Sequence, residues 1–359
     1  MSSANDIIYE DIEEIVRVVG KDTFRPLSGK RILITGPSGF LASYIVDTIA
    51  YLNDNIFDKP CQLTGLSRSY PAESDRLGHL LYRTDLSFIW LDVIRQTAFF
   101  PSFDFFIHAA GRSTPGYFVN NPIETIYVNI VALRWVLEKT VKANPKSVAF
   151  FSSSEVYGSP PPAWIPTPET YPGSTYSLGA RGCYTESKRC GEALCMAFHK
   201  EHKTPVKILR PMLVYGPGLS INDGRVIAEF MRQGINRQPI KMKDNGSAKR
   251  AYCYITDAII IFWKIFLSTW NGEAFNIGNE KESTTIRELA CLVHELCGID
   301  TEPETGQFNL SNEEVLSSAP VEARLSMAKV KARTGYEAKV SLREGLARTI
   351  EWNRRMLIS

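Results

Sequence analysis

The sequence lacks the features that mark several large classes of protein. It has no basic excess, because 41 lysines and arginines are balanced by 39 aspartates and glutamates and the formal net charge is +2. This balance argues against a protein that binds nucleic acid through its charge. No apolar run approaches the roughly 18 residues that cross a bilayer, since Lys264, Ser268 and Thr269 interrupt the richest one, residues 258–270. We therefore expect neither a nucleic-acid polymer nor a membrane as a partner.

Cysteine pairs and a basic leader are also missing. The seven cysteines are scattered without a CxxC pair, so we expect reduced thiols rather than a disulfide framework. His199 and His202 lie three residues apart on a predicted helix, but no other cysteine or histidine cluster completes a metal site, and we expect no metal. The first fifteen residues are acidic where an export signal is basic. We predict a cytoplasmic protein.

What is present is an ordinary globular composition with a periodic pattern. Hydrophobic residues make up 44% of the chain and charged residues 22%. The spacing of Ile8, Ile12, Ile15 and Val19 predicts one amphipathic helix that packs on the main body. We treat residues 1–28 as an N-terminal helical extension.

From residue 31, short apolar runs alternate with amphipathic stretches. Predicted strands cover residues 31–35, 62–66, 88–91, 105–109, 147–152 and 206–209. Predicted helices cover residues 39–53, 122–142, 182–202, 223–235, 257–270, 284–297 and 341–355. This alternation predicts an α/β protein with a doubly wound parallel sheet of the Rossmann type. We assign residues 29–215 to the dinucleotide-binding domain and 216–359 mainly to a smaller α/β substrate-binding lobe, with the chain free to cross between them.

A glycine-rich loop follows the first predicted strand and opens the first helix of the sheet. In Thr35-Gly36-Pro37-Ser38-Gly39-Phe40-Leu41-Ala42, Gly36 permits a tight turn, Gly39 lets the backbone approach a pyrophosphate and Ala42 keeps the helix close to the strand. The helix N-terminus then supplies N–H donors to phosphate. The position of this loop favours a dinucleotide site over a plain tight turn.

The next two strand ends bear on the form of the dinucleotide. The second strand ends in Leu66-Ser67-Arg68, without the carboxylate that would bind a free ribose 2′-hydroxyl. Arg68 fits a 2′-phosphate, which favours NADP, and equally fits an exposed position. Asp92, after the third strand, is a candidate for the adenine end and equally for a helix cap.

Two further elements carry the chemistry. In Tyr184-Thr185-Glu186-Ser187-Lys188, the i and i+4 side chains share a helix face, and the nearby cation is expected to lower the pKa of the phenol and make Tyr184 a base near neutral pH. Ser152-Ser153-Ser154-Glu155-Val156-Tyr157-Gly158 closes a central strand, where hydroxyls face the ligand crevice. Either of these two patterns alone also fits a polar surface. The glycine loop, the ends of the second and third strands, the Tyr184–Lys188 pair and the serine segment together form a specific combination.

These elements resemble the extended short-chain dehydrogenase/reductase family of nucleotide-sugar epimerases, dehydratases and decarboxylases. The resemblance runs from Gly29 to about Trp352 and is greatest to bacterial UDP-glucuronate decarboxylases, also called UDP-xylose synthases. Further segments that carry it are 108–110 (HAA), 181–189 (RGCYTESKR), 215–218 (YGPG), 222–226 (NDGRV), 250–257 (RAYCYITD), 275–279 (FNIGN) and 341–345 (SLREG).

The resemblance implies a role for each residue of the site. Tyr184 would take the proton of the sugar 4-hydroxyl while C4 gives hydride to NAD(P), Lys188 would hold the ribose, and Ser153 would bond to the same sugar oxygen. Glu155 and Arg250 would handle the substrate carboxylate and the proton returned to C5. Positions expected to contact the cofactor are Gly36, Ser38, Gly39, Phe40, Leu41, Arg68, Asp92, Val93, Ala109, Ala110, Tyr184 and Lys188. Positions expected to contact a nucleotide-diphosphate sugar are Ser154, Arg225 and Arg250.

The family pattern also ranks the reactions. The 4,6-dehydratases carry Asp where this chain has Ser154, a poor acid at neutral pH, so decarboxylation of a UDP-glucuronate-like substrate comes first, C4 epimerisation second and 4,6-dehydration third. A non-catalytic NAD(P)-binding sensor is the alternative of another class. The chain departs from the family at Leu213, where many members have Asn, at Ser67, and at residues 325–327. The resemblance implies a homodimer that pairs through the helix bearing Tyr184.

Overall fold

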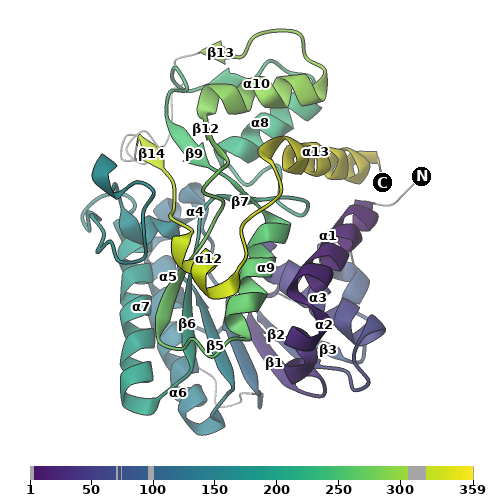
Figure 1. The fold of residues 1–359 in the computed structure, drawn as a ribbon, viewed down its shortest axis with the longest axis vertical. Helices are drawn as coiled ribbons and strands as arrows, with labels where there is room; N and C mark the ends of the chain where they lie inside the picture. Colours follow the sequence, from purple (N-terminus) through teal and green to yellow (C-terminus); the bar gives the residue numbers. More distant parts are fainter. Residues whose placement is uncertain (1–3, 70–71, 74, 96–100, 306–320, 359) are drawn as a thin grey trace.

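The computed structural model describes residues 4–69, 72–73, 75–95, 101–305 and 321–358. Its centre is a seven-stranded sheet with the order β11-β6-β5-β4-β1-β2-β3, in which every neighbouring pair is parallel (Figure 1). The strands are β1 (Arg31–Thr35), β2 (Gln62–Ser67), β3 (Leu86–Trp90), β4 (Phe105–His108), β5 (Ser147–Phe151), β6 (Val206–Pro211) and β11 (Glu273–Ile277). The predicted doubly wound Rossmann-type sheet is confirmed.

The central strand β1 shows how the sheet is buried on both faces. Ile32 and Ile34 point into a core with α1 (Ala4–Val19), α3 (Phe40–Asn55) and α9 (Ile255–Phe266). Leu33, between them, points into a separate core with α6 (Leu133–Ala143) and α7 (Gly182–His202). Because successive side chains of a strand alternate between faces, this continuous apolar run places helices on both sides of the sheet.

The seventh strand comes from a part of the sequence where no sheet strand was expected. β11 pairs in parallel with β6, with Glu273 opposite Lys207 and Ile277 opposite Pro211. The sheet therefore takes one strand from beyond residue 215, and the chain returns to it after leaving it. The exact division into two lobes stays a prediction.

One predicted helix is interrupted. Residues 122–142 form α5 (Pro122–Tyr127), a π-helical turn η3 (Val128–Ala132) and α6. In this turn Asn129 is buried and its side-chain N–H donates to Ser187 Oγ of α7 at 2.9 Å. A π turn changes the direction in which side chains point, which an apolar pattern does not reveal.

The remaining elements build the smaller lobe at the top of Figure 1 and the connections to it. Its helices include α8 (Val226–Ile235), α10 (Ile286–Cys297) and α13 (Leu342–Ile358), whereas α12 (Ala328–Thr334) packs against β11 and α9. Its short strands are β7 (Val214–Tyr215), β8 (Lys241–Met242), β9 (Lys249–Ala251), β10 (Cys253–Tyr254), β12 (Ser283–Thr285), β13 (Glu304–Thr305) and β14 (Glu322–Ala323). The other short helices are α2 (Lys21–Phe24), η1 (Arg25–Leu27), η2 (Gly78–Leu80), α4 (Pro115–Asn120), η4 (Ser154–Tyr157) and η5 (Pro162–Trp164).

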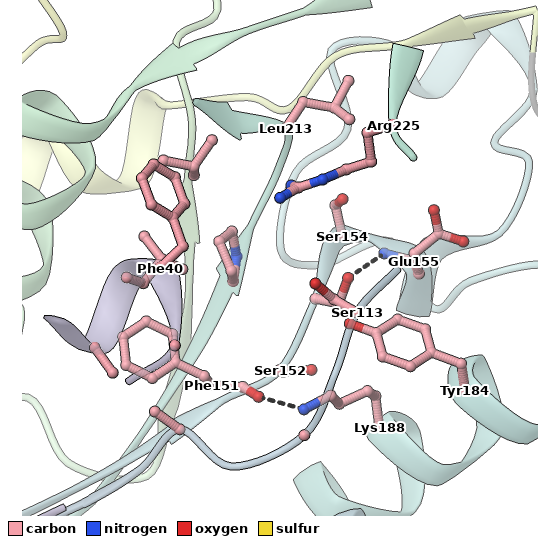
Figure 2. A pocket seen from close by; sticks show the side chains of 18 of the residues that line it. Phe40, Ser113, Phe151, Ser152, Ser154, Glu155, Tyr184, Lys188, Leu213 and Arg225 are labelled. Carbon is pink, nitrogen blue, oxygen red and sulfur yellow. Dashed lines mark hydrogen bonds between the residues drawn. The ribbon is translucent and has the colours of Figure 1, made fainter. Parts of the chain in front are cut away.

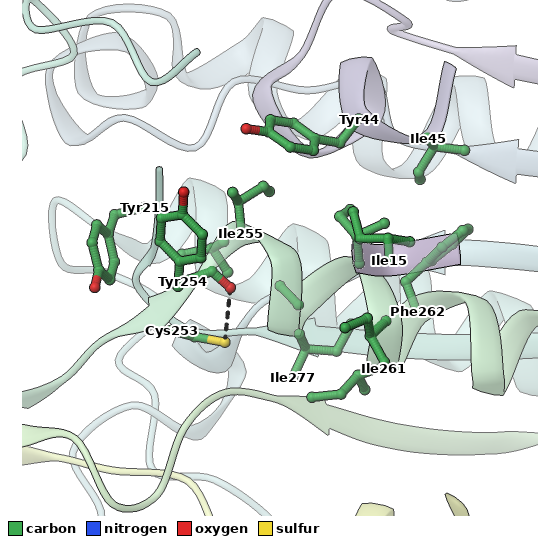
Figure 3. Close-up of a cluster of buried hydrophobic side chains, with 14 of the residues drawn as sticks. Ile15, Tyr44, Ile45, Tyr215, Cys253, Tyr254, Ile255, Ile261, Phe262 and Ile277 are labelled. Atoms are coloured by element: carbon green, nitrogen blue, oxygen red, sulfur yellow. Dashed lines mark hydrogen bonds between the residues drawn. The ribbon is translucent and has the colours of Figure 1, made fainter. Parts of the chain in front are cut away.

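The helix predicted from the isoleucine spacing is α1, and it is an integral part of the core. Ile8, Ile12 and Ile15 are at most 5% exposed, and Figure 3 shows Ile15 among side chains of the cluster that includes α3 and α9. Within the described part of the chain, no helix is both long enough and apolar enough to cross a membrane.

Candidate active site

A pocket opens at the carboxyl ends of β1, β4, β5 and β6 (Figure 2). In a parallel sheet this edge collects the loops that follow each strand, and ligands bind there. The side chains and backbone that line the pocket are Gly39, Phe40, Leu41, Ala42, Ala109, Gly111, Ser113, Pro115, Phe151, Ser152, Ser153, Ser154, Glu155, Arg181, Tyr184, Lys188, Pro211, Leu213, Val214 and Arg225. Ten of the predicted site residues are therefore brought together in one place.

The glycine loop has the geometry that a dinucleotide requires. Gly36 has φ +67° and lies so close to the end of β4 that a Cβ there would be 2.9 Å from Ala110 Cα. Its N–H donates to the Leu66 carbonyl at 2.9 Å, which ties the loop to the end of β2. Gly39, Phe40 and Leu41 then bring the N-terminus of α3 to the pocket. This cradle fits a dinucleotide pyrophosphate at the helix N-terminus.

Tyr184 and Lys188 lie on one face of helix α7, as the spacing predicts, and both side chains are buried. The Tyr184 phenol is hydrogen-bonded to the Ser153 side chain and stacks on Phe118 with ring centroids 4.9 Å apart. Lys188 Nζ donates to the Phe151 carbonyl at 2.7 Å and lies 5.8 Å from the Tyr184 ring centroid. Ser153 Oγ also accepts the Glu155 backbone N–H at 3.2 Å, which fixes the serine at the start of η4 (Figure 2).

The electrostatics of this pair differ from the sequence-based expectation. Burial raises the pKa of Tyr184 to about 12. The hydrogen bond to Ser153 and the Arg225 and Arg181 cations lower this pKa, but by less than burial raises it. Burial also lowers the pKa of Lys188 to about 7. The expected lowering of the phenol pKa is wrong, because desolvation is the largest cause of both shifts and raises the pKa of the phenol. Residue spacing carries no information about burial depth.

Glu155 has a partner that sequence reasoning did not assign. Arg181 Nε donates to Glu155 Oε2 at 3.0 Å, and Arg181 Nη2 donates to Oε1 at 2.9 Å. Arg181 directly precedes α7, three residues before Tyr184, and both members of this ion pair line the pocket. Arg181 stands in the sequence segment that carries the family resemblance, but its partner lies 26 residues away and no local pattern connects the two.

Of the three residues predicted to contact the substrate, two line the pocket and one does not. Ser154 and Arg225 line the pocket, and Arg225 forms an ion pair with Asp223, with Nη2 3.1 Å from Oδ2. Arg250 is not among the lining residues: its Nη1 donates to the backbone carbonyls of Lys249 at 2.7 Å and Val321 at 3.3 Å.

The residues proposed for the adenosine end lie outside the pocket. Arg68 forms an ion pair with Glu124, and Asp92 Oδ1 accepts the Ile94 backbone N–H at 3.0 Å, so Asp92 caps its own turn. Val93 is buried. Ser38 is exposed in the glycine loop, and Ala110 packs against Gly36 behind it.

Leu213 also lines the pocket, in an unusual conformation. Its φ is 43°, in the left-handed region that is uncommon for a residue other than glycine, asparagine or aspartate. Its side chain reaches the pocket beside Arg225 in Figure 2. This part of the pocket wall is therefore apolar.

The arrangement is that of an enzyme that moves a proton beside a bound dinucleotide. A phenol and a hydroxyl share a hydrogen bond, a buried amine lies behind them, and a glycine cradle stands opposite. Among the described residues, no group of three or more histidine, cysteine, aspartate or glutamate side chains is placed to hold a metal ion.

Comparison with known proteins identifies the family. The sequence model of the NAD dependent epimerase/dehydratase family matches residues 32–278. The chain is 30% identical over 319 residues to UDP-glucuronic acid decarboxylase 6 of Arabidopsis thaliana, covering 89% of this chain and 87% of the relative. It is 27% identical to UDP-glucuronic acid decarboxylase 1 of Xenopus tropicalis, covering 91% of this chain and 73% of the relative. The chain belongs to the NAD dependent epimerase/dehydratase family and is an enzyme that uses NAD(P).

Solved structures agree with the fold. UDP-glucose 4-epimerase of Thermotoga maritima, determined with UDP-glucose, superposes with a TM-score of 0.76 at 25% identity and covers 91% of this chain and 99% of its own. The dTDP-glucose 4,6-dehydratase DesIV of Streptomyces venezuelae, at 21% identity, has the same TM-score and covers 90% and 97%. The resemblance to UDP-glucuronate decarboxylases is confirmed, although the two relatives named here come from a plant and a vertebrate rather than from bacteria.

Proposed function

We propose that the protein decarboxylates a UDP-glucuronate-like nucleotide sugar and returns its NAD(P) to the starting oxidation state. The single observation that carries the proposal is the cluster at the carboxyl end of β5, where Tyr184, Ser153 and Lys188 lie beside the Glu155–Arg181 ion pair. The first three groups suit oxidation of a secondary alcohol, and the Arg181 guanidinium of the ion pair suits a substrate that carries an acidic group. The relatives named above support the same substrate class.

Each of these groups has a distinct task at the sugar. Tyr184 takes the proton of the 4-hydroxyl, and Ser153, already hydrogen-bonded to the phenol, holds the same oxygen in line. Lys188, fixed by the Phe151 carbonyl, would hold the ribose of the cofactor and add positive charge when it is protonated. A bound nicotinamide would supply a reversible hydride acceptor for C4. The 4-ketone formed by that oxidation is β to the C5 carboxylate, so that CO2 leaves readily and C5 takes up a proton in its place.

The acid–base groups of the pocket favour decarboxylation over dehydration. Expulsion of a hydroxyl needs an acid beside a base, and Ser154 offers only an alcohol next to Glu155. The Glu155 carboxylate is held by two hydrogen bonds from Arg181. C4 epimerisation is the second candidate, because it needs only the proton and hydride steps and rotation of the ketone.

The surroundings of Arg68 favour NAD over NADP. Its guanidinium is already paired with Glu124, so a 2′-phosphate at this position meets an arginine whose charge is balanced and a carboxylate that repels it. Release of the nucleotide from the purified protein, followed by chromatography against NAD and NADP standards, tests this. Recovery of NADP contradicts it.

A homodimer and a cytoplasmic location complete the proposal. Exposed apolar side chains on α5, α6 and α7 support pairing through the layer that bears Tyr184; they are Ile123, Ile126, Tyr127, Val141 and Met196. Ile123 is 66% exposed, so Ile123→Asp is expected to give a monomer by light scattering, whereas Tyr82→Asp, at an 82% exposed position outside these helices, leaves the mass unchanged. A wild-type protein that is monomeric at micromolar concentration contradicts the dimer.

The reaction is tested by product mass. Incubation with UDP-glucuronate is expected to give a product lighter by CO2, and Tyr184→Phe is expected to slow turnover by at least 100-fold, the scale of general acid–base catalysis, while nucleotide stays bound. Loss of water identifies a dehydratase, and an unchanged mass with a new retention time identifies an epimerase. No turnover of UDP-glucuronate, UDP-glucose or dTDP-glucose favours a non-catalytic NAD(P)-binding sensor.

A further inference from the structure

We infer that Arg181, rather than Arg250, receives the carboxylate of the substrate, and that Glu155 occupies this place until the substrate binds. The inference deepens the proposed function and rests on it, because it assigns the recognition of a uronic acid to one side chain. It follows from the geometry of the Arg181–Glu155 pair and from the partners of the other cations nearby.

The pair has the form in which a guanidinium binds a carboxylate. Arg181 presents Nε and Nη2 to the two oxygens of Glu155, at 3.0 and 2.9 Å, and two parallel hydrogen bonds of this kind give geometric specificity as well as strength. The residues come from different elements, since Arg181 precedes α7 and Glu155 belongs to η4. A fork that is already set for one carboxylate at the pocket wall fits a second one of the same shape.

The other cations are committed elsewhere. Lys188 is held by the Phe151 carbonyl, and Arg225 is paired with Asp223, which is two residues away on the same turn and does not line the pocket. Arg250 does not line the pocket, and its Nη1 donates to two backbone carbonyls, although its charge also interacts with Glu155 and Arg181. Among the described cations that line the pocket, Arg181 is the one whose carboxylate partner also lines it.

Electrostatics favour exchange of the two carboxylates. The Arg181 and Glu155 side chains are 20% and 36% exposed, so water reaches their ion pair and the pair is inexpensive to open. A substrate carboxylate that enters while Glu155 stays in place faces a like charge a few ångströms away, which disfavours the two carboxylates sharing Arg181. The arrangement of lower energy puts the substrate carboxylate on Arg181 and turns Glu155 aside.

The exchange also keeps a cation next to the phenol. Arg181 lowers the pKa of Tyr184 and Glu155 raises it. When Glu155 turns aside and the substrate carboxylate takes its place, Arg181 is still three residues from Tyr184 at the start of the same helix. The group that recognises the acid is therefore also one of the groups that favour loss of the phenol proton.

The test compares binding of an acidic and a neutral nucleotide sugar. Titration calorimetry with UDP-glucuronate and with UDP-glucose is carried out on NAD-loaded Tyr184→Phe, in which turnover is expected to be at least about 100-fold slower. The same titrations are carried out on this protein with Arg181→Gln, Arg181→Lys, Glu155→Gln or Arg250→Gln added. Circular dichroism establishes that each variant is folded. We expect Arg181→Gln to weaken UDP-glucuronate by about 10- to 100-fold, the scale of hydrogen bonds to charged groups, and to change UDP-glucose by less than about 3-fold.

The companion variants make the outcomes separable. Arg181→Lys should give an intermediate loss of affinity for UDP-glucuronate, because it keeps the charge without the fork. Glu155→Gln should tighten the binding of UDP-glucuronate, because it removes the competing carboxylate. Arg250→Gln should change the affinity for both nucleotides alike. Equal weakening of both nucleotides by Arg181→Gln, or a loss specific to UDP-glucuronate in Arg250→Gln, overturns the inference. A parent protein that does not prefer UDP-glucuronate to UDP-glucose overturns the proposed function instead.

Discussion

A single carboxylate on the N-terminal helix joins several parts of the protein, and its removal has a predictable effect on stability. Asp11 of α1 is 1% exposed. Its oxygens accept the Tyr44 hydroxyl of α3 at 3.0 Å and the Tyr254 hydroxyl of β10 at 3.0 and 3.2 Å, and it pairs with Arg348 of α13 at 2.8 Å. One side chain thus ties α1 to the helix that follows the glycine loop and to the smaller lobe.

Burial gives this carboxyl an unusual titration. Desolvation raises the pKa of Asp11 from 3.8 to about 6, although Arg348 and the tyrosine hydrogen bonds oppose it. The folded protein therefore binds the proton more tightly than the unfolded chain, and this contribution to stability, fully present below pH 3.8, is lost as the pH rises through 6. At pH 5, about one unit below the folded pKa, the contribution is about 1.4 kcal/mol, and at pH 8 it is absent.

Asp11→Asn removes the titration, so the comparison of the two proteins isolates it. Urea unfolding at pH 5 and at pH 8 should show that the free energy of unfolding of the wild type, relative to Asp11→Asn, falls by about 1.4 kcal/mol between the two pH values. Glu10→Gln, at the exposed neighbouring carboxylate, should change the free energy of unfolding by no more than about 0.5 kcal/mol at either pH. A difference between wild type and Asp11→Asn that is the same at both pH values, or larger at pH 8, refutes the reasoning.

Three other variants test the site. Gly36→Ala should lower the free energy of unfolding by about 1–3 kcal/mol, because the new Cβ meets Ala110. It should also reduce the amount of bound nucleotide measured by absorbance. The control Gly335→Ala has the same φ of +67° but open space around it, so it should be destabilised less and keep its nucleotide. Lys188→Met should lose at least about 100-fold of activity. Because the folded pKa of Lys188 is lowered to about 7, the wild type should gain about 2 kcal/mol of unfolding free energy relative to this variant between pH 7 and pH 9; no gain contradicts the burial argument. Leu213→Asn should raise the melting temperature or leave it unchanged, because asparagine tolerates a φ of 43° better than leucine. It should also change KM for the sugar. A lowered melting temperature with an unchanged KM contradicts the assigned position in the pocket.

The sheet could be predicted from the sequence because its signals are local. The strand predicted at residues 31–35 is observed at those bounds and the helix predicted at 182–202 is observed as α7, since each is a periodic run between turn residues. β11 was not predicted as a strand, because Glu273–Ile277 becomes one only by pairing with β6, more than sixty residues earlier. The break at residues 128–132 could not be predicted, because a π turn leaves the apolar pattern intact.

The candidate site likewise contains features that could be predicted from the sequence and features that could not. Tyr184 and Lys188 share a face because helix geometry places them there, and Ser153 lies beside them because β5 ends where ligands bind in such sheets. The raised pKa of Tyr184 and the Arg181–Glu155 pair depend on burial and on contacts between distant residues. Neither is encoded in spacing, and both change how the chemistry is understood.

The most direct test of the account is the mass of the product that the NAD-loaded protein forms from UDP-glucuronate. The account predicts a nucleotide sugar lighter by one CO2, with no net reduction of NAD, and at least about 100-fold slower formation by Tyr184→Phe. A product lighter by water, a product of unchanged mass, or full activity in Tyr184→Phe contradicts it.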